Sequence, residues 1–147
     1  FADIVNALTE RTGYQFDVTL APFARAAREV ERGSQDCTIL APLDTEKVIP
    51  GELTFHHPLG AVPNKSVSLK AYEDLSGLRI SVLRGGSLNE RFDNDEMGKP
   101  LVMQTIPLIF QCSKTSAQLD AMPAINQALR DMRAEGVFDI IQQQHEL

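Results

Sequence analysis

The sequence predicts an α/β fold in which a largely parallel sheet is flanked by helices, arranged as one domain or two small lobes. Two observations lead to this prediction. Helical and strand-like periods alternate over residues 2–41 with short connections, an order that favours parallel strands with right-handed crossovers. A stretch over 50–64 that contains three prolines then has the composition of a connector between lobes, which places a boundary near Pro63.

In the first half of the chain, apolar residues recur first at helical spacing and then at strand spacing. Ile4, Ala7 and Leu8 share one helical face, and Phe16 and Val18 alternate with polar neighbours as in a strand. Proline is tolerated in the first turn of a helix and glycine is favoured just past its end, which sets the helix boundaries. The predicted elements are a helix ending at Gly13, a strand over 14–20, a helix from Pro22 to Gly33 and a strand over 36–41.

The second half of the chain mixes turns, strands and two closing helices. Ser87 begins an S-x-x-E capping box, which is the best local helix-start signal in the sequence. Pro107 restricts the strand-like run around it to a sheet edge or a bulge. The predicted elements are a turn region over 72–77, a strand over 78–83, a helix from Ser87, a strand over 101–112, a helix from Pro123 to Gly136 and a last helix over 137–144 around Ile140 and Ile141.

The composition excludes several classes of partner. The 147 residues include 14 Lys plus Arg against 20 Asp plus Glu, and the formal net charge is -6. Without a basic stripe, neither nucleic acid nor an anionic membrane surface is expected as a partner. The longest uncharged stretches, 53–64 and 100–113, are broken by prolines and shorter than about 20 apolar residues, so no transmembrane segment is expected in this chain.

Few residues could carry covalent or metal chemistry. Cys37 and Cys112 each lie in an apolar strand, where the pKa of a thiol is raised and the side chain is inert, and a single bridge between them is the alternative. His56 and His57 are adjacent on an extended segment and face opposite sides, so they cannot easily share a metal. No P-loop, G-x-S-x-G or H-E-x-x-H motif is present. We therefore expect no catalytic residue, no metal and no cofactor.

A set of short motifs follows in a fixed order along nearly the whole chain. The motifs are Gly13-Tyr14, then Arg25, Arg28, Gly33 and Asp36, then Thr45-Glu46-Lys47 with Phe55 and Pro58, then Asp74-Leu75-Ser76-Gly77 with Gly85-Gly86-Ser87, and finally Ser113-Lys114. This ordered set resembles family 3 periplasmic solute-binding proteins, the receptors of amino-acid-type ABC importers. Two features depart from the family pattern. Lys47 stands near the position of the family's carboxylate-clamping arginine, and His56-His57 occupies a region where the family has a serine.

The resemblance implies a periplasmic-binding-protein-like type II fold with two lobes of mostly parallel sheet flanked by helices. Lobe 1 is expected over 1–62 and 97–147, and a partial lobe 2 over 63–96. Because the chain passes from lobe 2 almost directly to lobe 1 between Asp93 and Met97, the second lobe is expected to be truncated. A strand preceding the given sequence is expected to complete the sheet. The resemblance further implies a periplasmic or extracellular location, where a disulfide can form, and an ABC permease as a partner.

Ligands of open α/β sheets bind at loops that follow strand ends. The candidate ligand-binding residues are Phe23, Arg25, Asp44, Lys47, His57, Arg84, Gly86 and Ser87. Arg84 lies just before the capped helix start at Ser87, so a cation and free amides together predict an anion site, with a plain capped helix and a solvated Arg84 as the alternative. Lys47 would offer a point charge to a carboxylate, and its alternative is a surface lysine paired with Glu46 or Asp44.

These residues predict a non-catalytic protein that captures a small polar solute, anionic or amino-acid-like, between Lys47 and Arg84 on separate lobes. Phe23 is either an aromatic wall of that cleft or a core residue of its helix. A periplasmic dehydratase-like enzyme on the same scaffold is an alternative, although its candidate acids, Asp44 and Glu90, sit at a turn and in a capping box. A ligand-sensing input domain of a membrane receptor is the third hypothesis.

Overall fold

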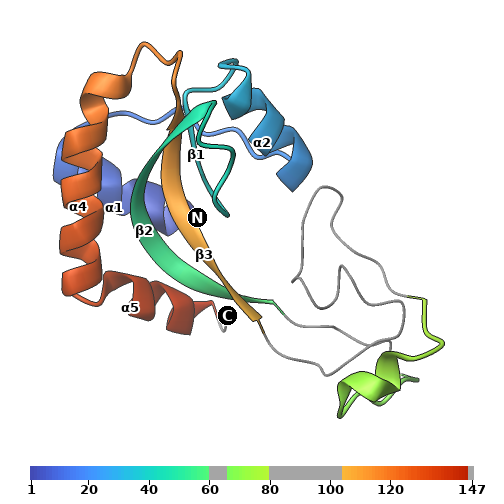
Figure 1. Cartoon of the computed structure of the whole chain (residues 1–147). Helices are drawn as coiled ribbons and strands as arrows, with labels where there is room; N and C mark the ends of the chain where they lie inside the picture. The colour runs from blue at the N-terminus through green and yellow to red at the C-terminus, as the bar shows by residue number, and fades with distance from the viewer. Residues whose placement is uncertain (60–65, 80–103, 146–147) are drawn as a thin grey trace. The chain divides into compact units, whose positions relative to one another are not determined.

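A computed structural model of the chain describes residues 1–59, 66–79 and 104–145 (Figure 1). Its elements are α1 (Ala2–Thr12), α2 (Phe23–Glu31), β1 (Cys37–Leu40), β2 (Val48–Leu59), the 3-10 helix η1 (Tyr72–Leu75), β3 (Gln104–Ser113), the 3-10 helix η2 (Leu119–Ala121), α4 (Met122–Ala134) and α5 (Val137–Gln144). The chain divides into two compact units. Unit 1 comprises Phe1–His57 with Pro107–Leu147, and unit 2 comprises Pro58–Ile106. The limits predicted for the two lobes stay a prediction.

Unit 1 is built around a three-stranded sheet with the order β1-β3-β2 (Figure 1). β1 pairs antiparallel with β3, so that Cys37 lies opposite Cys112 and Leu40 lies opposite Ile109. Helices and strands together confirm the predicted α/β class. The sequence predicted a largely parallel sheet, but β1 and β3 pair antiparallel, because β3 runs back through the middle of the sheet.

β2 also runs antiparallel to β3. At one end of β2, the carbonyl of Lys47 accepts a hydrogen bond from the N–H of Lys114 at 3.1 Å. Further along β2, the Thr54 hydroxyl donates to the carbonyl of Leu108 at 2.6 Å. Because β1 and β2 both run opposite to β3, they are parallel to each other with an antiparallel strand between them.

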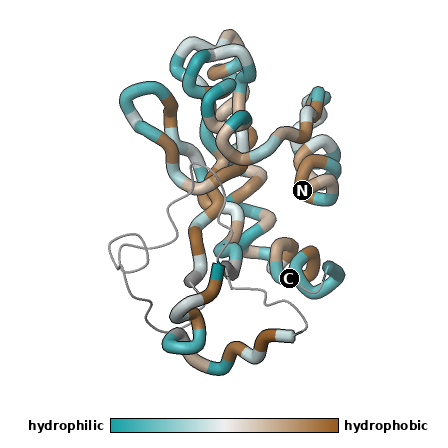
Figure 2. Tube along the Cα trace, turned by 90° about the vertical axis from the view of Figure 1, so that its right-hand side faces the viewer, coloured by the Kyte–Doolittle hydropathy of each residue, from teal (hydrophilic) through white to brown (hydrophobic). Residues whose placement is uncertain are grey.

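Helices α1, α4 and α5 cover one face of this sheet, and the apolar core of unit 1 lies between these helices and the sheet. Figure 1 shows α4 and α5 on one side of the strands and α2 on the other. In Figure 2, apolar and polar residues follow one another along α1 and α5, as in amphipathic helices. The buried residues of this core are Ile4, Leu8, Phe110, Cys112, Met122, Ile125, Ala128, Leu129, Met132 and Phe138.

Left-handed glycines mark the ends of two of these helices. Gly13 ends α1 in the left-handed conformation with φ 74°, and its N–H donates to the carbonyl of Thr9 at 2.9 Å. A second left-handed glycine, Gly136, separates α4 from α5. The predicted limits of the closing helices are confirmed, but α5 buries Phe138 whereas Ile140 is 53% exposed. Of the two residues predicted at the centre of this helix, Ile141 packs against the core and Ile140 does not.

The segment 14–20 does not form the predicted strand. Its apolar residues do alternate, but Val18 and Leu20 are 53% and 86% exposed. β1 has only β3 as its neighbour in the described sheet, so the segment has no backbone partner there. Alternation alone does not make a strand, because a strand also needs a partner for its backbone N–H and C=O groups.

Two proline-containing segments are more regular than expected. β2 continues as a strand over Val48–Leu59, through Pro50, where an extended but turn-rich connector was predicted. Pro107 lies in β3, which is the central strand of the sheet and not an edge. β1 ends at Leu40 opposite Ile109, so Pro107 is already beyond the end of that pairing, where a missing N–H costs less.

A disulfide joins Cys37 and Cys112, the opposed residues of β1 and β3. Cys112 is fully buried in the core of unit 1, and Cys37 packs against that core half-buried. Of the two alternatives for these cysteines, the bridge is the one present. It closes the chain on itself around all of β2 and unit 2.

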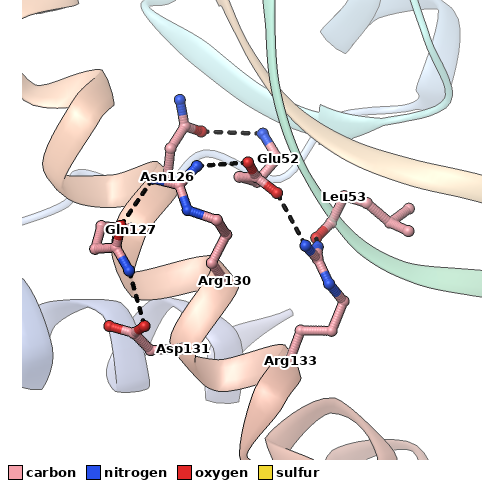
Figure 3. Close-up of polar contacts among 7 residues, drawn as sticks. All are labelled: Glu52, Leu53, Asn126, Gln127, Arg130, Asp131 and Arg133. Atoms are coloured by element: carbon pink, nitrogen blue, oxygen red, sulfur yellow. Dashed lines mark hydrogen bonds and ion pairs between the residues drawn. The ribbon is translucent and has the colours of Figure 1, made fainter.

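Polar contacts fasten α4 to the outer strand β2 (Figure 3). Glu52 accepts hydrogen bonds from Arg130 at 2.6 Å and from Arg133 at 3.0 Å. Arg133 also donates to the carbonyl of Leu53 at 2.6 Å, and the Asn126 side chain accepts from the N–H of Glu52 at 3.0 Å. The exposed side of α4 is therefore fixed to the sheet by hydrogen bonds, while its other side is fixed by apolar packing.

In unit 2, the described residues 66–79 contain one short 3-10 helix, η1. The Asp74 carboxylate accepts hydrogen bonds from the N–H groups of Lys70 at 2.8 Å and Ala71 at 2.9 Å, which lower the pKa of Asp74. The turn region predicted here is confirmed. None of the described helices is long and apolar enough to cross a bilayer. Of the strand predicted over 78–83, residues 78 and 79 are described and lie in no strand. The rest of that strand, the boundary near Pro63, the capping box at Ser87 and the passage between lobes over 93–97 lie outside the described residues.

Candidate functional site

The residues Ala41–Lys47, here called the 41–47 turn, connect β1 to β2 and contain two of the predicted ligand residues. Asp44 organises this turn. Its carbonyl accepts hydrogen bonds from the N–H groups of Lys47 at 3.0 Å and Val48 at 3.1 Å, and its carboxylate accepts one from the N–H of Glu46 at 2.9 Å. Aspartate favours turns because its side chain can bond the backbone two residues on in this way. The 41–47 turn is thus internally hydrogen-bonded.

β3 and Lys114, the residue that follows it, hold the two ends of the turn. At the entry, the fully buried Gln111 donates from Nε2 to the carbonyl of Ala41 at 2.9 Å, and its Oε1 accepts from the N–H of Leu43 at 3.0 Å. At the exit, Lys114 donates its N–H to the carbonyl of Lys47 at 3.1 Å. Successive side chains of a strand point to opposite faces, so Gln111 lies on the face opposite to the helical core.

Lys47 stands between two carboxylates. Its Nζ lies 3.8 Å from Asp44 Oδ2 and 3.9 Å from Glu31 Oε2, and its side chain is 54% exposed. These separations exceed a normal hydrogen bond, so the ion pairs are weak and the ammonium can turn to a ligand at little cost. One ammonium against two carboxylates leaves an excess of negative charge. Lys47, predicted as the cation of unit 1 that meets the solute, is therefore outnumbered by acids of its own unit.

Phe23 and Arg25 lie at the start of α2, whereas Glu31, the partner of Lys47, is its last residue. About 12 Å of helix separates the two ends. Arg25 donates to Glu29 within the helix at 2.8 Å, and this bond raises the pKa of the Arg25 guanidinium. Phe23 is half-buried, which fits either of its predicted roles. Among the residues that the structure describes, no hydrogen bond or ion pair joins Phe23 or Arg25 to the 41–47 turn.

His57 lies at the far end of β2 from Lys47, separated by about 30 Å of extended strand. Its ring meets the ring of Phe55 edge-on with centroids 6.3 Å apart, and Phe55 packs against Phe138 of the helical core. His57 is therefore associated with α5 and not with the turn. Among the described residues, no group of three or more His, Cys, Asp and Glu side chains could hold a metal ion. Arg84, Gly86 and Ser87 lie outside the described residues.

Two residues of the site, Glu31 and Gln111, were not predicted from the sequence. Glu31 belongs to the polar surface of α2, and nothing in its local pattern points to Lys47, which is 16 positions away. Gln111 did leave a signal, because it is the single strongly polar residue in the apolar run from Ile106 to Cys112. A long polar side chain inside a buried strand must find hydrogen-bond partners, so it indicates a loop or turn packed on that strand.

The fold of the chain is similar to that of substrate-binding domain 2 of GlnP from Lactococcus lactis, in a crystal structure of its open conformation. The match has a TM-score of 0.55 and 16% sequence identity, and covers 95% of this chain and 82% of that chain. It shows the same type of fold, which confirms the periplasmic-binding-protein-like fold expected from the ordered motifs. No protein-family model matches the chain, and a search of curated proteins found no match.

Proposed function

We propose that the chain is a non-catalytic, extracytoplasmic solute-binding module of the kind that delivers solutes to an ABC permease. The observation that carries the proposal is the fold shared with a transporter's substrate-binding domain over 95% of the chain. The disulfide between Cys37 and Cys112 supports the location, since such bonds persist in oxidising compartments and are rare in the cytosol.

The 41–47 turn is proposed as the part of unit 1 that contacts the solute. It follows a strand end, where ligands of open α/β sheets bind. It carries an exposed ammonium, Lys47, with two carboxylates, Asp44 and Glu31, less than 4 Å away. A solute with both an anionic and a cationic group, such as a free amino acid, satisfies this set better than a simple anion, because an anion alone would meet two negative charges. Arg84, Gly86 and Ser87 remain predicted ligand residues of the second unit.

Calorimetry and thermal unfolding with a panel of free amino acids, dicarboxylates and simple organic anions test the proposal. We expect at least one amino acid to bind and to raise Tm, as any ligand specific for the folded state does. Simple anions should bind more weakly. Absence of heat and of any Tm shift across the whole panel would contradict the proposed function, and binding of dicarboxylates alone would contradict the zwitterionic ligand.

The variant Lys47→Gln tests the site. Loss of a charge-assisted hydrogen bond to a carboxylate should weaken binding by about tenfold or more, with little change in stability, because the ion pairs of Lys47 are long and exposed. Lys114→Gln is the matched control. It removes the same charge from a neighbouring exposed residue and keeps the backbone hydrogen bond to Lys47. Equal losses of affinity in the two variants would show a general charge effect and no specific role for Lys47.

A further inference from the structure

We propose that Gln111 is a positioning residue, which holds the 41–47 turn in the conformation that presents Asp44 and Lys47 to the solute. The inference rests on the proposed function of that turn. Gln111 lies on β3 opposite Thr38 of β1, one residue before the disulfide-bonded Cys112. Its side chain reaches from the middle strand to the chain that has just left β1.

The backbone of the turn needs a partner at this place. After Leu40 the chain leaves the ladder with β3, so the carbonyl of Ala41 and the N–H of Leu43 have no strand partner. Both residues are half-buried, and an unpaired polar group away from water is costly. The Gln111 amide supplies a donor and an acceptor at once, at 2.9 Å and 3.0 Å. A side chain with only one of these functions would leave one backbone group unsatisfied.

The orientation of the amide follows from the same contacts. With its oxygen and nitrogen exchanged, Gln111 would point an acceptor at the carbonyl of Ala41 and a donor at the N–H of Leu43, and both contacts would be repulsive. Nε2 also lies 3.4 Å from the carbonyl of Leu40, which adds a further acceptor on the same side. The surrounding groups therefore select one orientation of the amide.

The strand positions next to the turn are held by contacts that do not depend on the Gln111 side chain. The disulfide fixes Cys37, at the start of β1, to Cys112, which is next to Gln111. At the other end of the turn, the N–H of Lys114 fixes the carbonyl of Lys47. β3 and the residue that follows it thus hold the entry and the exit of the turn, and only the contact at the entry is made by a side chain.

Amide hydrogen exchange of the protein without ligand tests the anchoring directly. Gln111→Met removes both hydrogen bonds at similar length, and the exchange of the Leu43 N–H should become about tenfold faster or more, with faster exchange through the rest of the turn. The amide exchange rates of α1 and α4 should change only as much as the lower global stability of the variant requires. Gln111→Glu should restore part of the protection at mildly acidic pH, because a buried neutral carboxylic acid offers a donor and an acceptor.

Thr54→Val is the matched control, since it removes a buried hydrogen bond that β2 donates to β3 and does not touch the turn. The Thr54→Val variant should have a lower Tm, with unchanged amide hydrogen exchange in the 41–47 turn and unchanged affinity for amino acids. Gln111→Met should weaken the binding of any amino acid that the wild type binds by about tenfold. Unchanged exchange at Leu43, or a loosened turn with full affinity, would overturn the positioning role. A loosened turn in a protein that binds no solute would instead overturn the proposed function and leave the anchoring intact.

Discussion

The two faces of the sheet in unit 1 are held together in different ways. Four consecutive residues of β3 show the contrast, since Phe110 and Cys112 belong to the apolar core, whereas Gln111 and Ser113 are buried and polar. The apolar face gains stability from the area removed from water, and many side chains of similar volume would satisfy it. The opposite face also buries Val30 of α2, but next to the 41–47 turn it depends on single hydrogen bonds, each of which needs one donor and one acceptor. The first face stabilises the fold, and the second gives the 41–47 turn its shape.

The polar face extends beyond Gln111 to the end of α2. Ser113 and Thr115 share a hydrogen bond between their hydroxyls at 3.0 Å, and the hydroxyl of Ser116 donates to Asp36 at 2.6 Å. The chain after α2 passes close to these hydroxyls at Gly33, where a Cβ would overlap the Thr115 hydroxyl. The chain is tightly packed here at Gly33, so a larger side chain at that position should disturb the hydrogen bond between Ser113 and Thr115.

The largest effect is expected from removal of the disulfide on the apolar face. The bridge joins residues 75 positions apart, and the loop-entropy estimate for a closed loop of that length is about 4.5 kcal/mol of unfolding free energy. The double variant Cys37→Ala with Cys112→Ala should lose about that amount in urea denaturation. Reduced wild type is the control, because it breaks the bridge and keeps the sulfur volume. A loss below about 1 kcal/mol in both would show that the bridge adds little to the packing of this face.

Two glycines offer a matched test of the crowding on the polar face. Gly13 and Gly33 have nearly the same φ, 74° and 76°, so alanine at either site carries the same cost of a left-handed backbone, about 1 kcal/mol. A Cβ at Gly13 has nothing within 4 Å, whereas at Gly33 it displaces the Thr115 hydroxyl from Ser113. Gly33→Ala should therefore cost about 1 kcal/mol more than Gly13→Ala in the same denaturation assay. Equal losses would show that Thr115 moves aside freely.

The elements of the apolar face could be predicted from the sequence because their signals are local. In α4, Ile125, Leu129 and Met132 recur at helical spacing between Pro123 and Gly136, and all three are buried. Apolar periodicity indicates which side of a helix or strand is buried, even when the element that covers that side is not known. The same signal failed at 14–20, because alternation does not show whether a neighbouring strand is present.

The candidate site was predicted only in part because its contacts join residues far apart in the sequence. Asp44 and Lys47 could be singled out as a turn after a strand. The partnership of Gln111 with Ala41 and Leu43 depends on the antiparallel return of β3, whose pairing the sequence left open. The partnership of Lys47 with Glu31 depends on how α2 packs beside the turn, and no local pattern reports that packing.

The smallest effect is expected where α4 meets the outer strand, outside both faces. Burial by itself would raise the pKa of Glu52, but hydrogen bonds from Arg130 and Arg133 outweigh it and hold the pKa below its ordinary value of 4.5. A carboxylate with a lowered folded pKa stabilises the protein above its unfolded pKa and loses that contribution as the pH falls through the folded pKa. Glu52→Gln should therefore cost up to about 1 kcal/mol near neutral pH, and the difference from wild type should vanish as the pH falls well below 4.5. Glu10→Gln, at an exposed position of α1, is the control and should show a smaller difference near neutral pH. A cost for Glu52→Gln that persists in acid would mean that the side chain acts through its shape and not through its charge.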